Sequence, residues 1–375
     1  MEENNKKVIA AMKKFEQVYF IVDSRIQASL YEPWQRSFER TGCAVEILNT
    51  EKLASSMLRS IKLNWLMQIY RWSRRDEHNS KVQSVLVKIF KPIRIWVLNR
   101  INQQLESKIK KKHALVFVFK GLDVKPTMLN KLKQKKNLLV VLNGDSFFNM
   151  KSSNQSILES AQIYDAVITW SDLLDNELKL KLCLTNTIQL PFSCEEVSNP
   201  AKPSWFQLDL SRSLVFVGVW DKEREEEIAK IEYDNIVVFG PYWDRRNSSF
   251  PANINVFSFR LEPEEIAFIY ENSAACLNLM RPQNADSHNM KTFEIPAANG
   301  TMILPRTLFH MKVFKDAQSV YFYDQCSDIG EIMKKVVLDD PGSRKNAADK
   351  TKKMVLDMHS YDNRLSDLLN YLKEK

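Results

Sequence analysis

Short apolar runs, each ending at a polar residue, recur through the first half of the chain. They cover residues 18–22, 44–48, 114–119, 138–142, 166–170 and 187–193. Short runs without polar alternation are typical of parallel strands that are buried on both faces. A helical pattern over 31–41, with Trp34 and Phe38 facing inward and Gly42 as its stop, separates the first two runs. This β-α-β order predicts a right-handed crossover in a doubly wound sheet.

The second half of the chain repeats the arrangement. Apolar runs lie at 214–217, 236–239, 255–259, 274–279, 301–304 and 320–323. Helical patterns cover 224–231, 263–272 and 326–338, and two more, 343–358 and 361–375, end the chain. The proline-containing stretch 195–208 is the best candidate for a linker. We therefore expect an N-terminal domain over 1–200, a C-terminal domain over 205–350, and C-terminal helices over 351–375.

Residues 59–112 form a basic helical insertion in the first domain. They carry 14 Lys and Arg against three acids, a net charge of +11, whereas the whole chain carries +8. The positive charge is therefore local. Apolar residues recur there at helical spacing, and Pro92 is expected to kink the second helix. The stripe comprises Leu58, Ile61, Trp65, Ile69 and Trp72, followed by Val82, Val85, Leu86, Ile89, Ile93, Trp96 and Val97.

Two interpretations of the insertion 59–112 stay open. The apolar stripe can pack on the first domain while the charges face water. Alternatively, the tryptophan-containing basic helices can lie in an anionic membrane surface. Nucleic acid is a third partner for such charge, but no recognised nucleic-acid motif accompanies it, which argues against that partner.

The composition narrows the class of protein. With 44% hydrophobic and 27% charged residues the chain resembles an ordinary globular protein. Its five cysteines are scattered, as expected of reduced thiols in a cytoplasm, and no secretory signal is visible at the N-terminus. Only eight glycines occur, and neither G-x-G-x-x-G nor a P-loop is among the motifs. This argues against a dinucleotide dehydrogenase or a P-loop ATPase.

One polar loop carries most of the candidate chemistry. It follows the apolar run 274–279 and leads into a helix start at Thr292. Strand ends and helix N-termini of this kind form ligand sites in open α/β sheets. Asp286 and Glu294, with seven residues between them, could accept the hydroxyls of a ribose, while Arg281 and Lys291 could neutralise a diphosphate. An ordinary salt-bridged loop would show the same pattern.

The stretch 277–300, LNLMRPQNADSHNMKTFEIPAANG, resembles a segment of the CgeB-like (spore-maturation type) glycosyltransferases. In that family a strand ending in N-h-R-P runs into N-M-R-T-F-E-I-P-A-x-G. Lys291 stands where the family usually has arginine, so the charge is kept but the bidentate fork is lost.

Three further stretches resemble the same family in the same order. They are SLVFVGVW at 213–220 with Arg224 and Glu225 after it, VFGPYW at 238–243, and HSY at 359–361 followed by Arg364. The resemblance is strong over 205–370 and weaker over 114–195. It implies the GT-B arrangement, in which two Rossmann-like domains with doubly wound parallel sheets face a cleft. The C-terminal helices, 351–375, would return to the first domain.

The resemblance also implies an activity. It predicts transfer of a sugar from a nucleoside-diphosphate donor, UDP- or GDP-linked, to a glycan, lipid-linked or cell-surface polymer acceptor. Neither a metal nor another cofactor is expected. By match to the motif, Glu294 would bind the ribose, Lys291 and Arg281 would face the diphosphate, and Gly218 would permit close backbone approach. The predicted donor-binding residues are Gly218, Arg281, Asp286, Asn289, Lys291, Thr292 and Glu294.

The predicted catalytic residues are Asp23, Asp145 and His288. The two aspartates follow strands of the first domain and could act as general base on the acceptor hydroxyl, although each could instead cap a loop. His288 lies in the donor loop, and the alternative is an exposed histidine without a role in the reaction. No pattern in the sequence sets the oligomeric state.

Two other functional classes remain alongside the transferase. One is a non-catalytic scaffold of the same fold that binds a nucleotide or sugar. The other is a basic module that binds a polyanion or a membrane through 59–112. For the transferase and for both alternatives we expect a cytoplasmic location, or a peripheral one on the inner face of the membrane.

Overall fold

A computed structural model describes residues 15, 17–23, 28–73, 81–149, 153–197, 200–281, 284 and 286–374. The chain forms two compact units, which are described separately. Unit 1 comprises Met1–Leu190 and Arg364–Lys375, and unit 2 comprises Pro191–Asn363. In the part of the chain that is described, no helix has both the length and the apolar character needed to cross a membrane.

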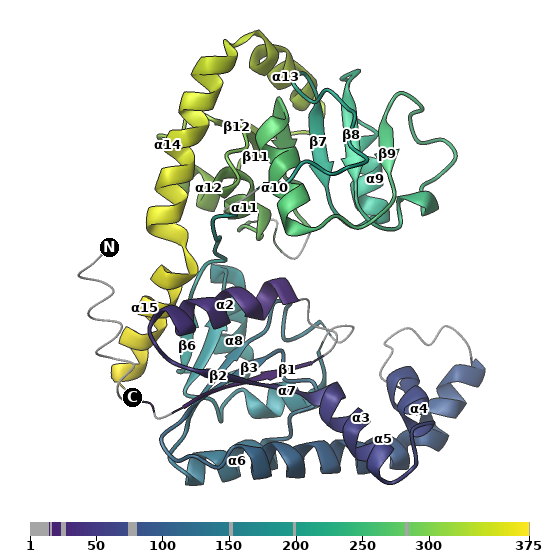
Figure 1. The fold of residues 1–375 in the computed structure, drawn as a ribbon, viewed down its shortest axis with the longest axis vertical. Helices are drawn as coiled ribbons and strands as arrows, with labels where there is room; N and C mark the ends of the chain where they lie inside the picture. The colour runs from purple at the N-terminus through teal and green to yellow at the C-terminus, as the bar shows by residue number, and fades with distance from the viewer. Residues whose placement is uncertain are drawn as a thin grey trace. The chain divides into compact units, whose positions relative to one another are not determined.

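Unit 1 is built on a six-stranded parallel sheet with the order β2-β1-β3-β4-β5-β6 (Figure 1). The strands are β1 (Val18–Val22), β2 (Val45–Asn49), β3 (Leu115–Phe119), β4 (Leu138–Leu142), β5 (Ala166–Thr169) and β6 (Thr187–Gln189). The helices are α2 (Ala28–Arg40), α3 (Thr50–Ser60), α4 (Leu66–Ser73), α5 (Lys81–Lys108), α6 (Pro126–Gln134), α7 (Gln155–Ser160) and α8 (Asp172–Leu182). Strand β6 ends before Pro191 and is shorter than the sequence predicts, because proline cannot donate to a ladder.

The core of unit 1 forms as the apolar runs predict. Phe20 on β1 packs edge-on against Phe38 of α2, with ring centroids 5.6 Å apart. Phe117 and Phe119 on β3 stack with centroids 4.5 Å apart. Gly42 ends α2 with a φ of +86°, a conformation that favours glycine. Across the two neighbouring strands, Phe20 of β1 is the register partner of Phe117 of β3, and their ring centroids lie 5.5 Å apart.

Helices α3, α4 and α5 form the predicted basic insertion, and they extend beyond the edge of the sheet (Figure 1). Its inner side is buried, as at Leu58, Tyr70 and Val97. Ile61 and Trp65, however, are 45% and 59% exposed, so the apolar stripe does not pack on the first domain along its whole length. The reason is local: α3 ends at Ser60 and the chain turns, which interrupts the helical period. The side chains of Trp72, Val82, Val85 and Leu86 lie outside the described residues.

Unit 2 contains a second six-stranded parallel sheet with the order β12-β11-β10-β7-β8-β9. The strands are β7 (Leu214–Val217), β8 (Ile236–Phe239), β9 (Asn255–Phe257), β10 (Ala275–Leu277), β11 (Met302–Pro305) and β12 (Val320–Tyr323). The helices are α9 (Lys222–Ile228), α10 (Pro263–Asn272), α11 (Lys291–Ala297), α12 (Leu308–Val313), α13 (Asp328–Leu338), α14 (Pro341–His359) and α15 (Tyr361–Lys373), the last of which continues into unit 1. Two sheets of this kind confirm the predicted fold class.

Two buried clusters lie against the sheet of unit 2, one including Phe293 and Val355 and the other including Trp243 and Leu277. Helix α11 packs on α14, where Phe293 stacks on His359 with ring centroids 4.5 Å apart. Asn299, just after α11, donates to Asp349 of α14 at 2.9 Å. These contacts fix α11, the helix that follows the polar loop, in a rigid part of unit 2.

Candidate functional site

The loop after β7 is held tightly against the end of β8. The Gly218 amide donates to the Phe239 carbonyl at 2.8 Å, and the Trp243 indole donates to the Gly218 carbonyl at 2.8 Å. Gly240 has a φ of +145°, and a Cβ there would lie 2.0 Å from the Gly218 oxygen. Only glycine fits at position 240, and the backbone at Gly218 is therefore fixed from two sides.

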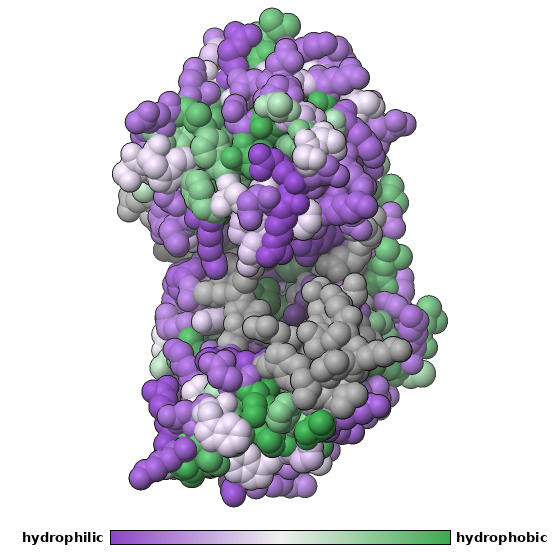
Figure 2. Space-filling view, turned by 90° about the vertical axis from the view of Figure 1, so that its right-hand side faces the viewer, coloured by the Kyte–Doolittle hydropathy of each residue, from purple (hydrophilic) through white to green (hydrophobic). Residues whose placement is uncertain are grey.

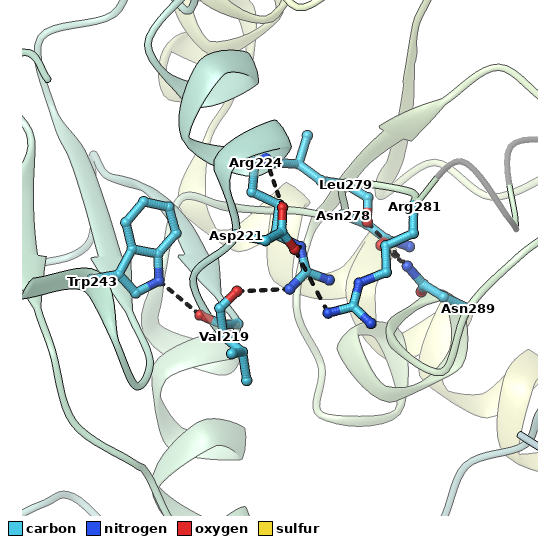
Figure 3. Close-up of polar contacts among 9 residues, drawn as sticks. Val219, Asp221, Arg224, Trp243, Asn278, Leu279, Arg281 and Asn289 are labelled. Carbon is cyan, nitrogen blue, oxygen red and sulfur yellow. Dashed lines mark hydrogen bonds and ion pairs between the residues drawn. The ribbon is translucent and has the colours of Figure 1, made fainter. Parts of the chain in front are cut away.

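Asp221 caps α9 and lies close to two arginines (Figure 3). Its carboxylate accepts from the Arg224 amide at 2.9 Å. The Arg224 Nε and the Arg281 Nη2 lie 3.4 Å and 3.6 Å from Asp221 Oδ2. Arg281 comes from the polar loop after β10, so one carboxylate joins the ends of β7 and β10, the neighbouring strands at the switch point of the sheet.

Arg224 is the more buried of the two arginines, with its side chain 11% exposed against 48% for Arg281. Its Nη1 donates to the Val219 carbonyl at 2.8 Å, and its Nε makes no hydrogen bond within the described residues. Burial and the neighbouring Arg281 lower its pKa from the usual value. The guanidinium is thus positioned by the Val219 carbonyl and the Asp221 carboxylate.

Lys291 completes a cluster of three cations. Its Nζ lies 5.2 Å from the ring centroid of Phe216, and the Arg224 guanidinium lies 5.6 Å from the same ring. A Cβ on Gly218 would come within 3.2 Å of that Nζ. Burial, followed by repulsion from Arg224, lowers the pKa of Lys291 to about 7, although the nearby Glu294 opposes the shift. The amine therefore sits where an added negative charge would stabilise its protonated form.

Glu294 lies on the first turn of α11, three residues after Lys291. Burial raises its pKa, and the Lys291 charge opposes that rise. The side chain is half-buried. Asp286, the other predicted carboxylate, is exposed in a turn of the polar loop.

A chain of hydrogen bonds fixes the start of α11. Asn289 Nδ2 donates to Asn278 Oδ1 at 2.7 Å, and Asn278 Nδ2 donates to the Thr292 hydroxyl at 3.2 Å. Thr292 in turn lies 3.2 Å from His310 Nε2, and His310 Nδ1 lies 2.8 Å from the Pro305 carbonyl. Since a carbonyl can only accept, His310 carries its proton on Nδ1, and the Thr292 hydroxyl donates to Nε2. Asn289 and Thr292 thus fix the first turn of α11, which carries Lys291 and Glu294.

His288 is fully buried, in contrast to the exposed alternative that its loop position suggests. Its Nε2 accepts from the Phe192 amide at 3.0 Å, and its Nδ1 lies 2.9 Å from the Ser287 hydroxyl. The ring stacks on Phe309 with centroids 3.9 Å apart. Through these two contacts His288 joins the polar loop to the Phe192 backbone.

Asp23 and Asp145 both belong to unit 1. Asp23 follows β1 and is 3% exposed. Asp145 follows β4, and its Oδ2 lies 2.9 Å from the Lys120 ammonium. Each carboxylate stands at the carboxyl end of a parallel strand, as predicted. Across the described ranges, no group of three His, Cys, Asp or Glu side chains is placed to hold a metal ion.

A cavity of about 760 Å³ opens beside the cation cluster in unit 2. Arg224 and Arg281 line it together with the residues that follow β12, such as Asp324 and Gln325. Its size falls in the range of sites for small molecules and cofactors, about 300 to 1,000 Å³. Sequence reasoning missed three members of the site: Asp221, Arg224 as a ligand-binding residue, and His310.

Comparison with known proteins supplies a class for this site. Residues 220–370 match the family described as "Glycosyl transferase-like". No curated protein matches the sequence. The family match begins just before the Asp221 cap and ends after α14, so it includes the whole cation cluster.

Several solved structures share this fold of two parallel sheets. Trehalose-6-phosphate synthase OtsA is 11% identical with a TM-score of 0.61, over 96% of this chain and 99% of that one. Sucrose-phosphate synthase from Thermosynechococcus elongatus is 11% identical with a TM-score of 0.60, over 96% and 98%. S. aureus TarM in complex with fondaparinux, α-GlcNAc-glycerol and UDP is 13% identical with a TM-score of 0.51, over 73% and 58%.

At these identities the structures show a shared fold, which is GT-B. The family match adds a likeness to glycosyltransferases over residues 220–370. The chain therefore has the GT-B fold, and the part of it that holds the cation cluster matches a glycosyltransferase family.

Proposed function

We propose that the protein transfers a sugar from a UDP- or GDP-linked donor, bound in unit 2, to a hydroxyl of a glycan, lipid-linked or cell-surface polymer acceptor. The observation that carries this proposal is the convergence of Arg224 and Arg281 on one carboxylate at the ends of β7 and β10, with Lys291 beside Arg224 over the Phe216 ring. The four motif stretches of the sequence support a CgeB-like enzyme in particular.

The three cations suit the diphosphate of the donor. As the glycosidic bond breaks, negative charge grows on the leaving nucleoside diphosphate, and fixed cations stabilise that charge without reorganisation. Arg224 and Lys291 are partly desolvated before binding, which strengthens their interaction with an anion. Glu294, one turn along α11, is the proposed acceptor of the ribose hydroxyls.

We propose that this cluster supplies enough positive charge for the donor to bind and react without a divalent ion. Transfer should then persist in excess EDTA. On the acceptor side, Asp23 and Asp145 remain the candidates for a general base, and Asp145 would first have to release Lys120. Alanine at either position that leaves the transfer rate unchanged would remove it from the mechanism.

The first test is a thermal-shift screen against UDP, GDP, ADP, CMP and their sugar conjugates. A ligand at about 100 times its dissociation constant should stabilise the folded protein by about 2.7 kcal/mol. Nucleotides that bind are then assayed for turnover by release of the nucleoside diphosphate. Binding without turnover in the presence of candidate acceptors would favour the non-catalytic scaffold.

Variants connect binding to the named residues. Glu294→Gln and Arg224→Gln should each weaken donor binding by about tenfold or more, since each removes a charge-assisted contact. Lys222→Gln is the matched control, because Lys222 lies on the first turn of α9 but its side chain is 82% exposed. Equal affinity in the Glu294 variant and the wild type would overturn the ribose assignment.

A further inference from the structure

The insertion α3–α5 carries a surface that the donor site does not explain. Its 14 Lys and Arg against three acids, over 59–112, make it the basic part of a chain whose remainder is slightly acidic. This charge belongs to unit 1, and no residue of the cation cluster in unit 2 contributes to it.

The inner side of the insertion already has its partners. Leu66, Met67 and Tyr70 of α4 are buried. The Tyr70 hydroxyl donates to the Asp123 carboxylate at 3.0 Å, and Asn102 of α5 donates to the Asp123 carbonyl at 2.9 Å. Packing on unit 1 therefore uses this inner side, and the apolar residues on the outer side serve another purpose.

The outer side exposes large apolar residues. Trp65 is 59% exposed, Ile61 is 45% exposed, and Ile89 and Ile95 of α5 are 60% and 43% exposed. Figure 2 faces the end of unit 1 from which α4 and α5 extend, and it shows apolar residues in green among hydrophilic ones in purple. Isolated apolar residues are common on protein surfaces, but a group of this size on one helical segment marks an interaction surface.

A groove joins two of the helices on this side. Ile61 and Met57 from α3 and the turn after it line a cavity of about 440 Å³, together with Trp96 and Arg100 of α5. The Arg100 guanidinium lies 6.0 Å from the Trp96 ring centroid. Because Ile89 is seven residues before Trp96, the helical period places it on the same side of α5. The groove thus brings Ile61, Trp96 and Arg100 together on one side of the insertion.

The cations around this surface are exposed to water. Arg59 and Lys62 flank Ile61, and Lys88 and Lys91 flank Ile89. A surface with exposed isoleucine and tryptophan beside exposed cations matches the boundary between anionic headgroups and acyl chains. A polyanion such as RNA would use the cations but would gain nothing from the isoleucines. A second copy of the chain would bring the same positive charge and be repelled.

We propose that the outer side of α3–α5 docks unit 1 on a membrane surface that contains anionic lipid. Ile61, Trp65, Trp96 and Ile89 would enter the headgroup region, and the surrounding Lys and Arg would contact lipid phosphates. The segment lies on the bilayer and does not cross it. This inference does not depend on the donor site and can fail while donor binding succeeds.

The test is co-sedimentation of the full chain with vesicles of phosphatidylcholine, alone or with about one third phosphatidylglycerol, at low and at physiological salt. Binding is expected only to the anionic vesicles and should weaken with salt. Removing one cation near such a surface costs about fivefold in affinity, so Arg59→Gln combined with Lys62→Gln should lose about 25-fold. Trp65→Ser combined with Ile61→Ser should lose at least about tenfold.

Leu180→Ser is the matched control, because Leu180 on α8 is 82% exposed but lies outside the insertion. It should bind vesicles as the wild type does, and each variant should keep the wild-type melting temperature. No binding to anionic vesicles would overturn the proposal. So would binding that the Trp65 and Ile61 substitutions leave unchanged while RNA competes fully, because that result describes a polyanion site.

Discussion

Lys291 should make donor binding depend on pH. Its pKa of about 7 in the donor-free protein means that the amine is largely neutral above that pH. A bound diphosphate favours the ammonium form, so binding above pH 7 requires uptake of a proton. The affinity for the donor should therefore be highest below pH 7. Above pH 7 it should fall by about tenfold per pH unit, until the pH reaches the pKa of Lys291 in the donor complex.

The magnitude follows from the fraction of protonated amine. At pH 9 a group with a pKa of about 7 is about 1% protonated, so the dissociation constant should be about a hundredfold larger than at pH 6. Titration calorimetry with UDP-glucose and GDP-mannose is the assay, because their phosphodiester groups do not titrate in this range. Two buffers with different ionisation enthalpies at pH 8 should report uptake of about one proton.

Lys291→Arg is the control variant, since a guanidinium stays charged throughout. It keeps Glu294 and the rest of the site, and its affinity should be almost flat between pH 6 and pH 9. The reasoning is refuted if the wild type binds equally well at both pH values and takes up no proton. It is also refuted if the arginine variant shows the same slope as the wild type, because another group would then be titrating.

Three further predictions concern the framework of the site. Gly240→Ala should destabilise the protein by about 3 kcal/mol or more, as the new Cβ would meet the Gly218 carbonyl at 2.0 Å, and urea unfolding measures this. Trp243→Phe should lose about 2 kcal/mol in the same assay, since it leaves that carbonyl unpaired; a loss below about 0.5 kcal/mol would argue against the hydrogen bond. His310 has a pKa lowered to about 4 by burial, so its contribution to stability should fall by about 3 kcal/mol from pH 6.5 to pH 4. Comparison with His310→Asn isolates that slope, and equal slopes would contradict it.

The strands and most helices of both units follow from the sequence because buried parallel strands leave short, continuous apolar runs. Strands β4, β8 and β12 begin and end where the apolar pattern does. Ile61 and Trp65 are spaced helically from Leu58, but α3 ends at Ser60, so the spacing does not bring them to the buried side of that helix. Periodicity alone does not report where a helix stops.

Part of the candidate site could also be predicted from the sequence. Lys291 and Glu294 stand in a segment that resembles a family motif, whereas Arg224 stands in the charged run DKEREEE, where a solvated helix face is the ordinary expectation. Arg224 differs from a solvated residue by its hydrogen bond to the Val219 carbonyl, which forms only in the folded chain. The burial of His288 likewise depends on residues that are distant from it in the sequence. They are Phe192 and, on α12, Phe309.

Asp221 gives the cation cluster a resident anion. Its carboxylate already lies near Arg224 and Arg281 in the donor-free protein, so any incoming ligand competes with a single negative charge tethered at high local concentration. Small monoanions such as chloride or acetate offer no more charge than the carboxylate they would displace. A diphosphate offers two negative groups and several oxygens at once. A ligand that displaces the Asp221 carboxylate from the two arginines therefore has to carry more negative charge than that carboxylate does.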